Sequence, residues 1–355
     1  MQEFQDGTVT EVQERRQLLK TGADFMMNYE IFKDVVTEKF LSYMPKEYQD
    51  MQVRVVPVEK VNRKLDGLDL RRQDGAGMVS PTIYINNIYE EYLRTGDLEK
   101  SLQNAADALD RVFRERPMPP LDLRGAKDNM IFELVNTMQN ENMLKNMPHR
   151  EYQDLSIIYR WVVGADDKGI SSVVIHNGLA KELGMDEEQL FRAAMVNTRR
   201  ILPPTVKSMN EVIRDMLLAD GLPPGVADLM VGETQPKETL WIISNDYGTR
   251  GAASMLYEEK LHGLAEDLES DLYVMPSSVH EVIAVSVEMG KPEELAGMVA
   301  EINMNEVALE DRLSNQVYHY DKDLRKITLA TDTPNKRLDG VVAERGMVYE
   351  AGQSR

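Results

Sequence analysis

Hydrophobic side chains recur every three or four residues between positions 25 and 43, a spacing typical of a helix that buries one face. The repeating positions are Phe25, Tyr29, Phe32, Val36, Phe40 and Tyr43. Asp24 stands where an N-cap belongs, and Pro45 follows the end of the pattern. We therefore predict a helix that begins after Asp24 and ends before Pro45.

The pattern then changes to short runs typical of strands. These runs cover 51–61, a stretch near 68–70 and 82–86. Two helical segments are predicted after them, over 87–95 and 97–116. Together these elements predict an N-terminal α+β domain over 21–116, preceded by a flexible lead-in at 1–20.

Prolines at positions 117, 119 and 120 interrupt any helix and predict a linker over 117–123. A second α+β domain is predicted over 124–330, and a polar, flexible tail over 331–355. The second domain opens with predicted strands at 129–136, 154–164 and 169–177. Helices are predicted near 178–183, from Asp186 to Arg200 and over 207–218, and a loop rich in Pro and Gly is predicted from Asp220 to Lys237.

The last part of the second domain gives the clearest pattern. Strands are predicted at 240–245, 271–276 and 279–287, and two possible edge strands come later, in YHYD and LRKITLAT. One helix, with Tyr257 and Leu261 on its apolar face, separates the first two strands, and Pro292 opens another. The order β-α-β-β-α-β favours a mixed, partly antiparallel sheet packed with helices. The predicted fold class is thus α+β, in two lobes.

Composition narrows the class of protein. The 355 residues are 42% hydrophobic and 28% charged, as in globular proteins. No apolar run approaches the ~18 residues that span a bilayer, and the polar N-terminus does not resemble a signal peptide. The chain has no cysteine, which excludes disulfides, thiolate metal sites and a cysteine nucleophile. We expect a cytoplasmic protein.

The net charge of −19 is concentrated toward the C-terminus. Residues 221–355 contain 12 basic and 24 acidic side chains, which gives −12. No basic stripe could follow a phosphate backbone, so direct nucleic-acid binding is disfavoured. The acidic third could meet a basic protein partner or mimic DNA, or it could serve only solubility.

Several longer stretches carry a resemblance to a known family. They are PTIYINNIYEEYLRTGDLEKSL, NMPHREYQDLSIIYRWVV, NTRRILPP, LWIISNDYGTRGAASMLYEEKL and DLYVMPSSVHEVIAVSV. Over positions 25–320 the chain resembles an uncharacterised family of gut Firmicutes, catalogued as domain of unknown function 5688. The resemblance implies a bacterial cytoplasmic protein, carried in some cases on mobile elements. It implies no activity and no functional residues.

The stretch PSSVHEVI at 276–283 places His280 beside Glu281. In a strand over 279–287 the two side chains point to opposite faces, so they cannot act as a pair. Glu281 then lies on the more apolar face, where it must sit at the rim or pair with a cation such as Arg250 or Arg160. Ser277 or Ser278 could act as a nucleophile activated by His280 if the turn curls back, although turn serines usually bond the local backbone.

The second candidate is the loop between the strand at 240–245 and the next helix. Asn245, Asp246, Thr249 and Arg250 could bind an anion there, because loops after strands and helix N-termini favour ligands. The alternative is that Asp246 or Thr249 caps the helix. The pair His149–Arg150 is predicted to be a solvated connector.

Two hypotheses about function follow. The preferred one is a non-catalytic interaction or regulatory protein with an acidic surface, because no phosphate-binding loop, zinc-binding HExxH or nucleophile elbow occurs. The alternative is a hydrolase or a nucleotide-handling enzyme whose site joins the 245–251 loop to the 276–281 turn. The sequence predicts no metal site and no cofactor.

Overall fold

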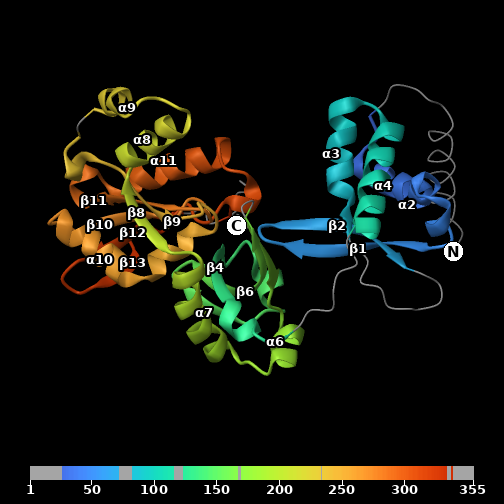
Figure 1. Cartoon of the computed structure of the whole chain (residues 1–355), viewed down its shortest axis with the longest axis horizontal. Coiled ribbons are helices and arrows are strands. Elements are labelled where there is room, and N and C mark those ends of the chain that lie inside the picture. Colours follow the sequence, from blue (N-terminus) through green and yellow to red (C-terminus); the bar gives the residue numbers. More distant parts are fainter. Residues whose placement is uncertain are drawn as a thin grey trace, which may run out of the picture. The chain divides into compact units, whose positions relative to one another are not determined.

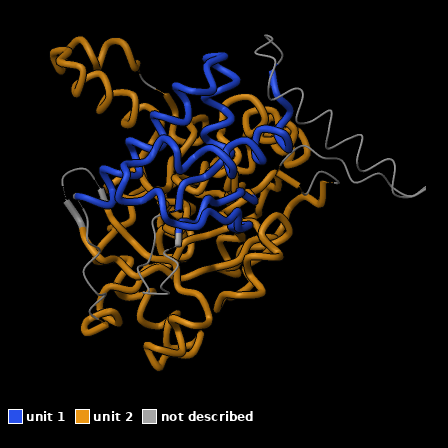
Figure 2. Tube along the Cα trace, turned by 90° about the vertical axis from the view of Figure 1, so that its right-hand side faces the viewer, with its two compact units in different colours: residues 1–59, 64–121 blue, residues 60–63, 122–355 orange. Residues whose placement is uncertain are grey.

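A computed structural model describes residues 26–71, 82–115, 123–166, 169–232, 234–333 and 337–338 (Figure 1). Contacts divide the chain into two compact units, which Figure 2 colours separately. The first comprises 1–59 and 64–121, and the second comprises 60–63 and 122–355. Most of the predicted linker at 117–123 and of the tail at 331–355 lies outside the described residues, but Thr331 and Leu338 are described and buried.

The first unit contains a small sheet and three helices on one side of it (Figure 1). Its elements are α2 (Tyr29–Tyr43), η1 (Lys46–Tyr48), β1 (Gln52–Lys60), β2 (Arg63–Arg71), β3 (Ile83–Tyr84), α3 (Ile85–Thr95) and α4 (Leu98–Glu115), and the strand order is β1-β2-β3. The predicted helix after position 25 is confirmed as α2, whose Phe32, Val36 and Phe40 are buried.

Two boundaries in the first unit differ from the prediction. The N-cap of α2 is Asn28, whose side chain accepts a hydrogen bond from the Ile31 N–H, whereas Asp24 lies outside the described residues. The strand predicted over 82–86 is reduced to β3 because α3 already begins at Ile85. Ile85, Ile88 and Tyr92 all face the core from α3, so the helical spacing prevails over the β-branched composition.

The second unit opens with a four-stranded antiparallel sheet and the helices beside it. Its elements are η2 (Ala126–Asn129), β4 (Met130–Asn136), α5 (Glu141–Leu144), β5 (His149–Tyr152), β6 (Leu155–Asp166), β7 (Gly169–Val174), α6 (Asn177–Leu183) and α7 (Glu187–Ile201). The long strand β6 pairs with β4, β5 and β7. The predicted hairpin is therefore confirmed, and Asp186 caps α7 in a capping box with Gln189.

The rest of the second unit forms a six-stranded sheet with its helices. Its elements are β8 (Pro204–Ser208), α8 (Met209–Ala219), α9 (Pro224–Val231), η3 (Pro236–Glu238), β9 (Trp241–Asn245), η4 (Gly251–Leu256), α10 (Glu258–Asp267), β10 (Leu272–Met275), β11 (Val282–Ser286), η5 (Val287–Met289), α11 (Pro292–Asn305), η6 (Leu309–Asp311), β12 (Tyr318–Asp321) and β13 (Lys326–Leu329). The strand order is β13-β12-β10-β11-β9-β8.

The α+β class is confirmed, but this sheet is antiparallel rather than mixed in every described pair. The reason lies in the position of β11. After β9 the chain crosses through η4 and α10 and returns as β10 one place too far to pair with β9. The short turn then sends β11 back into the gap, where it runs antiparallel to both neighbours.

The two faces of this sheet bury different helices, as alternation along a strand requires. Leu272 and Val274 of β10 belong to the main core, together with residues of α10, α7 and the four-stranded sheet. Met275 of β10 and Val285 of β11 point the other way and pack against Val299 of α11. The four-stranded sheet and the six-stranded sheet thus share one large core.

The segment Asp220–Lys237 was predicted to be a loop, and this is wrong. It contains α9, with Pro224 in the first turn, where its missing N–H costs nothing. The sequence suggested a loop because Pro223, Pro224 and Gly225 stand together, although these residues can also begin a helix. Among the described residues, no helix has the length and apolar character needed to cross a bilayer.

Candidate functional site

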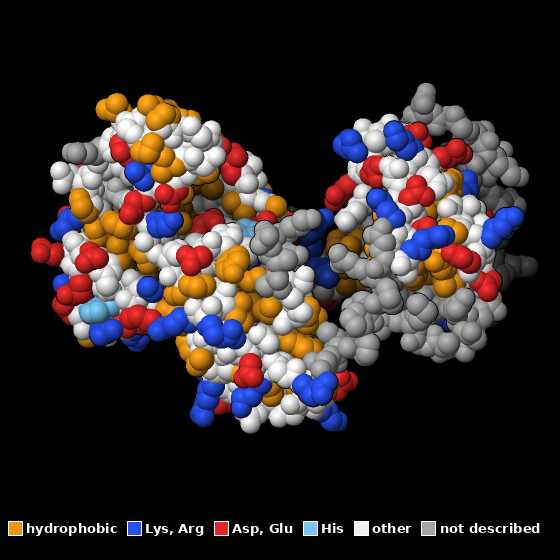
Figure 3. All heavy atoms as spheres, viewed as in Figure 1, with side chains coloured by type: hydrophobic (Ala, Val, Ile, Leu, Met, Phe, Trp, Pro, Cys, Tyr) orange, Lys and Arg blue, Asp and Glu red, His pale blue; other side chains and the backbone are white. Residues whose placement is uncertain are grey.

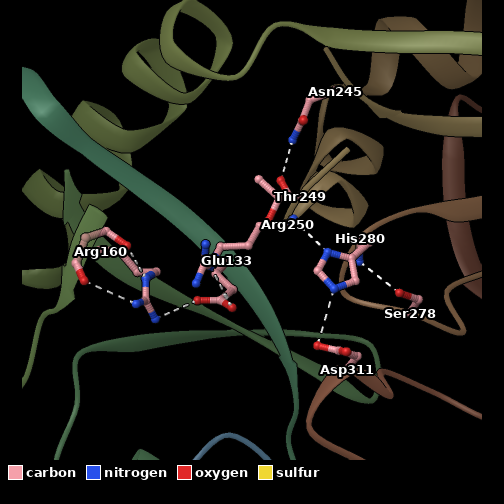
Figure 4. Close-up of polar contacts among 9 residues, drawn as sticks. Glu133, Arg160, Asn245, Thr249, Arg250, Ser278, His280 and Asp311 are labelled. Atoms are coloured by element: carbon pink, nitrogen blue, oxygen red, sulfur yellow. Dashed lines mark hydrogen bonds and ion pairs between the residues drawn. The ribbon is translucent and has the colours of Figure 1, made fainter. Parts of the chain in front are cut away.

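The two candidate loops meet at one end of the inner strands β9 and β11 of the six-stranded sheet (Figure 4). Strand β9 ends where β11 begins because they pair antiparallel, with Ile243 opposite Val282. The Ser244 hydroxyl donates to the His280 carbonyl over 2.8 Å, and the Ala252 N–H donates to the Val279 carbonyl over 3.2 Å. The residues on both sides of the 245–251 loop are therefore hydrogen-bonded to the backbone of the 276–281 turn.

Gly251 makes this close approach possible. A Cβ atom at position 251 would collide with the Ser244 hydroxyl and the His280 carbonyl, and would lie 2.9 Å from the Asn245 nitrogen. The preceding residue, Arg250, has a φ of 51°, in the left-handed region that side chains other than glycine rarely adopt. The loop is thus held in a specific and costly backbone conformation.

The side chain of Asn245 organises the 245–251 loop. One interpretation of the sequence was that Asp246 or Thr249 of this loop caps the following helix. Its amide donates to the Thr249 carbonyl over 2.8 Å, and its side-chain oxygen accepts from the Tyr247 N–H over 2.9 Å. The prediction that Asp246 or Thr249 caps the helix is wrong, because η4 begins after Arg250 without a side-chain cap. The polar side chain at the strand end serves the turn instead.

His280 contacts the neighbouring loop and a carboxylate from opposite ring nitrogens. Nδ1 accepts from the Arg250 N–H over 3.4 Å, and Nε2 lies 3.3 Å from Asp311 Oδ1 in η6 (Figure 4). The contact to Asp311 places a proton on Nε2. The imidazole is about one-third exposed and bridges three segments of the second unit.

The two candidate serines are both buried in the turn. The Ser278 hydroxyl accepts from the His280 N–H over 3.0 Å, and Ser278 pairs with Arg312 in an isolated β-bridge. The Ser277 carbonyl accepts from the Leu313 N–H over 2.9 Å. Since both nitrogens of the His280 ring already have partners, the geometry favours a structural role for these serines.

Residues 279–281 do not form the predicted beginning of a strand. Strand β11 starts at Val282, and the chain bends at Val279 and His280 because their backbone groups bond to η6, to η4 and to the Ser244 hydroxyl of β9. The predicted strand thus begins three residues too early, and strand alternation does not apply to His280 and Glu281. Burial raises the pKa of Glu281, and the nearby His280 and a hydrogen bond from Ser278 partly oppose that effect.

The cation partners predicted for Glu281 bind a different carboxylate. Arg160 Nη1 lies 3.0 Å from Glu133 Oε2, and Arg250 Nε lies 3.3 Å from Glu133 Oε1. Glu133 is only 5% exposed, in the middle of the apolar strand β4. A buried carboxylate requires such partners. Glu281 is therefore not neutralised by either arginine.

This arrangement links the loop to the four-stranded sheet. Arg160 Nε also donates to the Ser172 hydroxyl over 2.8 Å, which fixes the guanidinium between β6 and β7. The Glu133 carboxylate thus pairs with two guanidinium groups, of which that of Arg250 is the more exposed. We use the name loop cluster for Glu133, Arg160, Arg250, His280 and Asp311.

The comparisons with known proteins now identify the family. Residues 29–322 match the model of a family of unknown function, DUF5688. The chain belongs to the DUF5688 family. No curated protein and no solved structure matches it. The family assignment made from the sequence is confirmed. Because the function of the family is unknown, we infer the roles of the residues in this DUF5688 protein from their geometry.

The loop cluster contains acidic, basic and imidazole groups. No group of three or more His, Asp or Glu side chains within the described ranges is placed to hold a metal ion. A surface cavity of about 540 Å³ lies elsewhere in the DUF5688 fold. Its lining residues are Gln235, Pro236, Lys237, Glu238, Asp267, Leu268, Glu269, Glu288 and Met289. None of them comes from the two candidate loops.

Sequence reasoning missed Glu133 and Asp311. A signal for Glu133 was present, since a carboxylate inside the run MIFELV must have a cation nearby. Asp311 gave no signal, because its role depends on η6 folding back beside the turn. Arg150 was also misread as part of a solvated connector. It lies in β5 and pairs with Glu187 and Glu188 of α7, at 2.8 and 2.5 Å.

Proposed function

We propose that this DUF5688 protein is a non-catalytic interaction or regulatory protein that binds a basic protein partner. The observation that carries the proposal is the charge of residues 221–355, which contain 24 acidic and 12 basic side chains. A field of this sign attracts a basic partner and speeds the encounter. It also repels the phosphate backbone of nucleic acids.

The loop cluster supports the proposal because its polar groups are engaged with one another. The Glu133 carboxylate is shared by Arg160 and Arg250, and the His280 ring is occupied on both nitrogens. Polar groups that are paired in this way stabilise a fold. We place the protein in the bacterial cytoplasm, a setting that suits a chain without cysteine.

The experiment is a pull-down with the full-length protein from an extract of the encoding bacterium, washed at several salt concentrations. Exposed charges are screened over about 8–10 Å at physiological ionic strength. Recovery of the partner should therefore fall steeply as salt rises through that range. A partner recovered equally at low and high salt, or no partner at all, would contradict the proposal.

A second function is favoured by one observation, the junction of the 245–251 loop with the 276–281 turn. We keep as an alternative a hydrolase in which His280, oriented by Asp311, acts as the general base. The test is hydrolysis of nitrophenyl esters, nitrophenyl phosphate and nucleoside triphosphates. A hydrolase should turn over one of these substrates, and His280→Ala should abolish that turnover without loss of the fold.

A further inference from the structure

The helices α8 and α9 expose five large apolar side chains. Leu229 is 85% exposed, Met230 64% and Met216 63%, and Ile213 and Val226 are also exposed. Figure 3 shows hydrophobic side chains gathered where Figure 1 places these helices. We call these five residues the α8–α9 patch. Single exposed apolar residues are ordinary, but a contiguous group marks a binding surface.

The helix pair also has little core of its own. Helix α8 has no buried residue, and α9 buries only Ala227. In contrast, α7, α10 and α11 each bury at least three residues. Helices of 11 and eight residues are marginal without tertiary packing. Additional burial against a partner is therefore the missing contribution.

Local contacts explain why the pair is ordered without that burial. Ser208 and Glu211 form a capping box at the start of α8, and Arg214 Nε donates to Asp228 Oδ1 over 2.5 Å, which joins the two helices. Pro224 supports the first turn of α9. The side chains at 226, 229 and 230 share one helical face, as a helix-binding surface requires.

Charge identifies the occupant. Residues 204–232 contain four acidic and two basic side chains, and both basic groups are already paired, Lys207 with Asp215 and Arg214 with Asp228. The net charge of −2 that these residues carry suits a cationic amphipathic helix, and methionine adapts to irregular partners. A second copy would bring together two chains of net charge −19, and an anionic membrane would be repelled in the same way.

We infer that the α8–α9 patch binds a positively charged amphipathic helix of a partner protein. The inference rests on the proposed function, and it names the surface and the chemistry of the partner. The apolar face of the incoming helix packs on Leu229, Met230 and Met216, while its Lys or Arg side chains meet the net negative charge of residues 204–232.

The test uses a fluorescein-labelled peptide of about 18 residues, with Leu on one helical face and Lys on the other. Fluorescence anisotropy measures its binding to the full-length protein. The double variant Leu229→Gln/Met230→Gln should weaken binding about tenfold or more. The matched control is Leu324→Gln, which changes a leucine that is 74% exposed outside the patch and should leave binding unchanged. A counterpart peptide with Glu in place of Lys should not bind.

Five outcomes would overturn the inference. The double variant could bind the Lys peptide as well as the parent does. The Glu peptide could bind as well as the Lys peptide, which would mean that the surface binds apolar peptides whatever their charge. Vesicles of phosphatidylserine and phosphatidylcholine could sediment the parent but not the double variant. Light scattering could show a dimer that the double variant abolishes. If the salt-sensitive partner of the pull-down also binds the double variant normally, the inference fails while the proposed function survives.

Discussion

The loop cluster and the α8–α9 patch are opposite solutions within one unit. In the loop cluster the Glu133 carboxylate is buried, the other charged or polar groups are partly buried, and each is paired with a neighbour. In the α8–α9 patch, side chains that usually belong in a core remain exposed. The loop cluster could be mistaken for an active site, and the helix pair could be dismissed as a surface loop.

The difference shows which of the two regions still has apolar surface to bury. A buried charge with its partners in place has its desolvation already compensated, so it indicates a structural tie. An ordered helix pair that buries almost nothing has apolar area left to bury. We therefore expect substitutions in the loop cluster to change stability, and substitutions in the α8–α9 patch to change association.

The largest effect is expected for Glu133→Gln. The substitution leaves Arg160 and Arg250 without their shared carboxylate, and an uncompensated charge in this setting costs about 3 kcal/mol. Urea unfolding measures the loss. The control is Glu259→Gln, which removes an exposed partner of Arg199 and should cost no more than about 0.5 kcal/mol. Equal midpoints for the two variants would show that the loop cluster is not a structural tie.

A smaller loss is expected for Gly251→Ala, which tests the junction of the two loops. The new methyl group has no room beside Ser244 and His280, and crowding of this kind costs about 1–3 kcal/mol. Gly263→Ala in α10 is the matched control, because a methyl group there meets nothing within 4 Å and should raise helix stability slightly. Thermal melting compares the two. A neutral Gly251→Ala would mean that the loops are free to separate.

The elements with a clear hydrophobic period were predictable from the sequence. The helix α2 with its buried Phe32 and Phe40, the hairpin of β6 and β7 and the capped helix α7 all follow from local spacing and local chemistry. The error at 220–237 has the same local origin. Two prolines and a glycine there are compatible both with a loop and with the start of α9.

The candidate site was predictable only as far as local order reaches. The convergence of the 245–251 loop and the 276–281 turn follows from the pairing of β9 with β11. The alternative hypothesis joined the two loops only because both follow strand ends, and the sequence did not predict that pairing. The partners of Arg250 and His280 come from Glu133 in β4 and Asp311 in η6, far away in sequence. Non-local ion pairs leave no periodic trace, so the arginines were assigned to the wrong carboxylate.

The next smaller effect is expected for His280→Ala. The variant loses the acceptor of the Arg250 N–H and the contact to Asp311, which together contribute about 1–2 kcal/mol to stability. It should still bind the partner protein. A matched control is His319→Ala, which breaks another imidazole–carboxylate pair, with Asp271 at 3.0 Å. Melting and the pull-down are measured on both. If both variants melt alike but only His280→Ala loses the cellular function, the hydrolase alternative is correct.

The smallest effect is expected for Glu281→Gln, and its sign depends on pH. Burial raises the pKa of Glu281 in the folded state, so the folded protein favours the protonated form more than the unfolded chain does. Below the unfolded pKa, about 4.3, the carboxyl is protonated in both states and the variant should melt like the parent. As pH rises through the raised folded pKa, the parent must ionise a buried group and loses stability, which the variant does not.

The melting temperature of Glu281→Gln should therefore rise relative to the parent as the pH increases above about 4.3. Glu301→Gln, at an exposed position of α11, corrects for removing one negative charge from a strongly acidic protein. The opposite sign, with Glu281→Gln melting below the parent at neutral pH, would mean that a cation holds the Glu281 carboxylate ionised. Arg160 and Arg250 would then not be committed to Glu133, and the loop cluster would no longer be a closed set of partners.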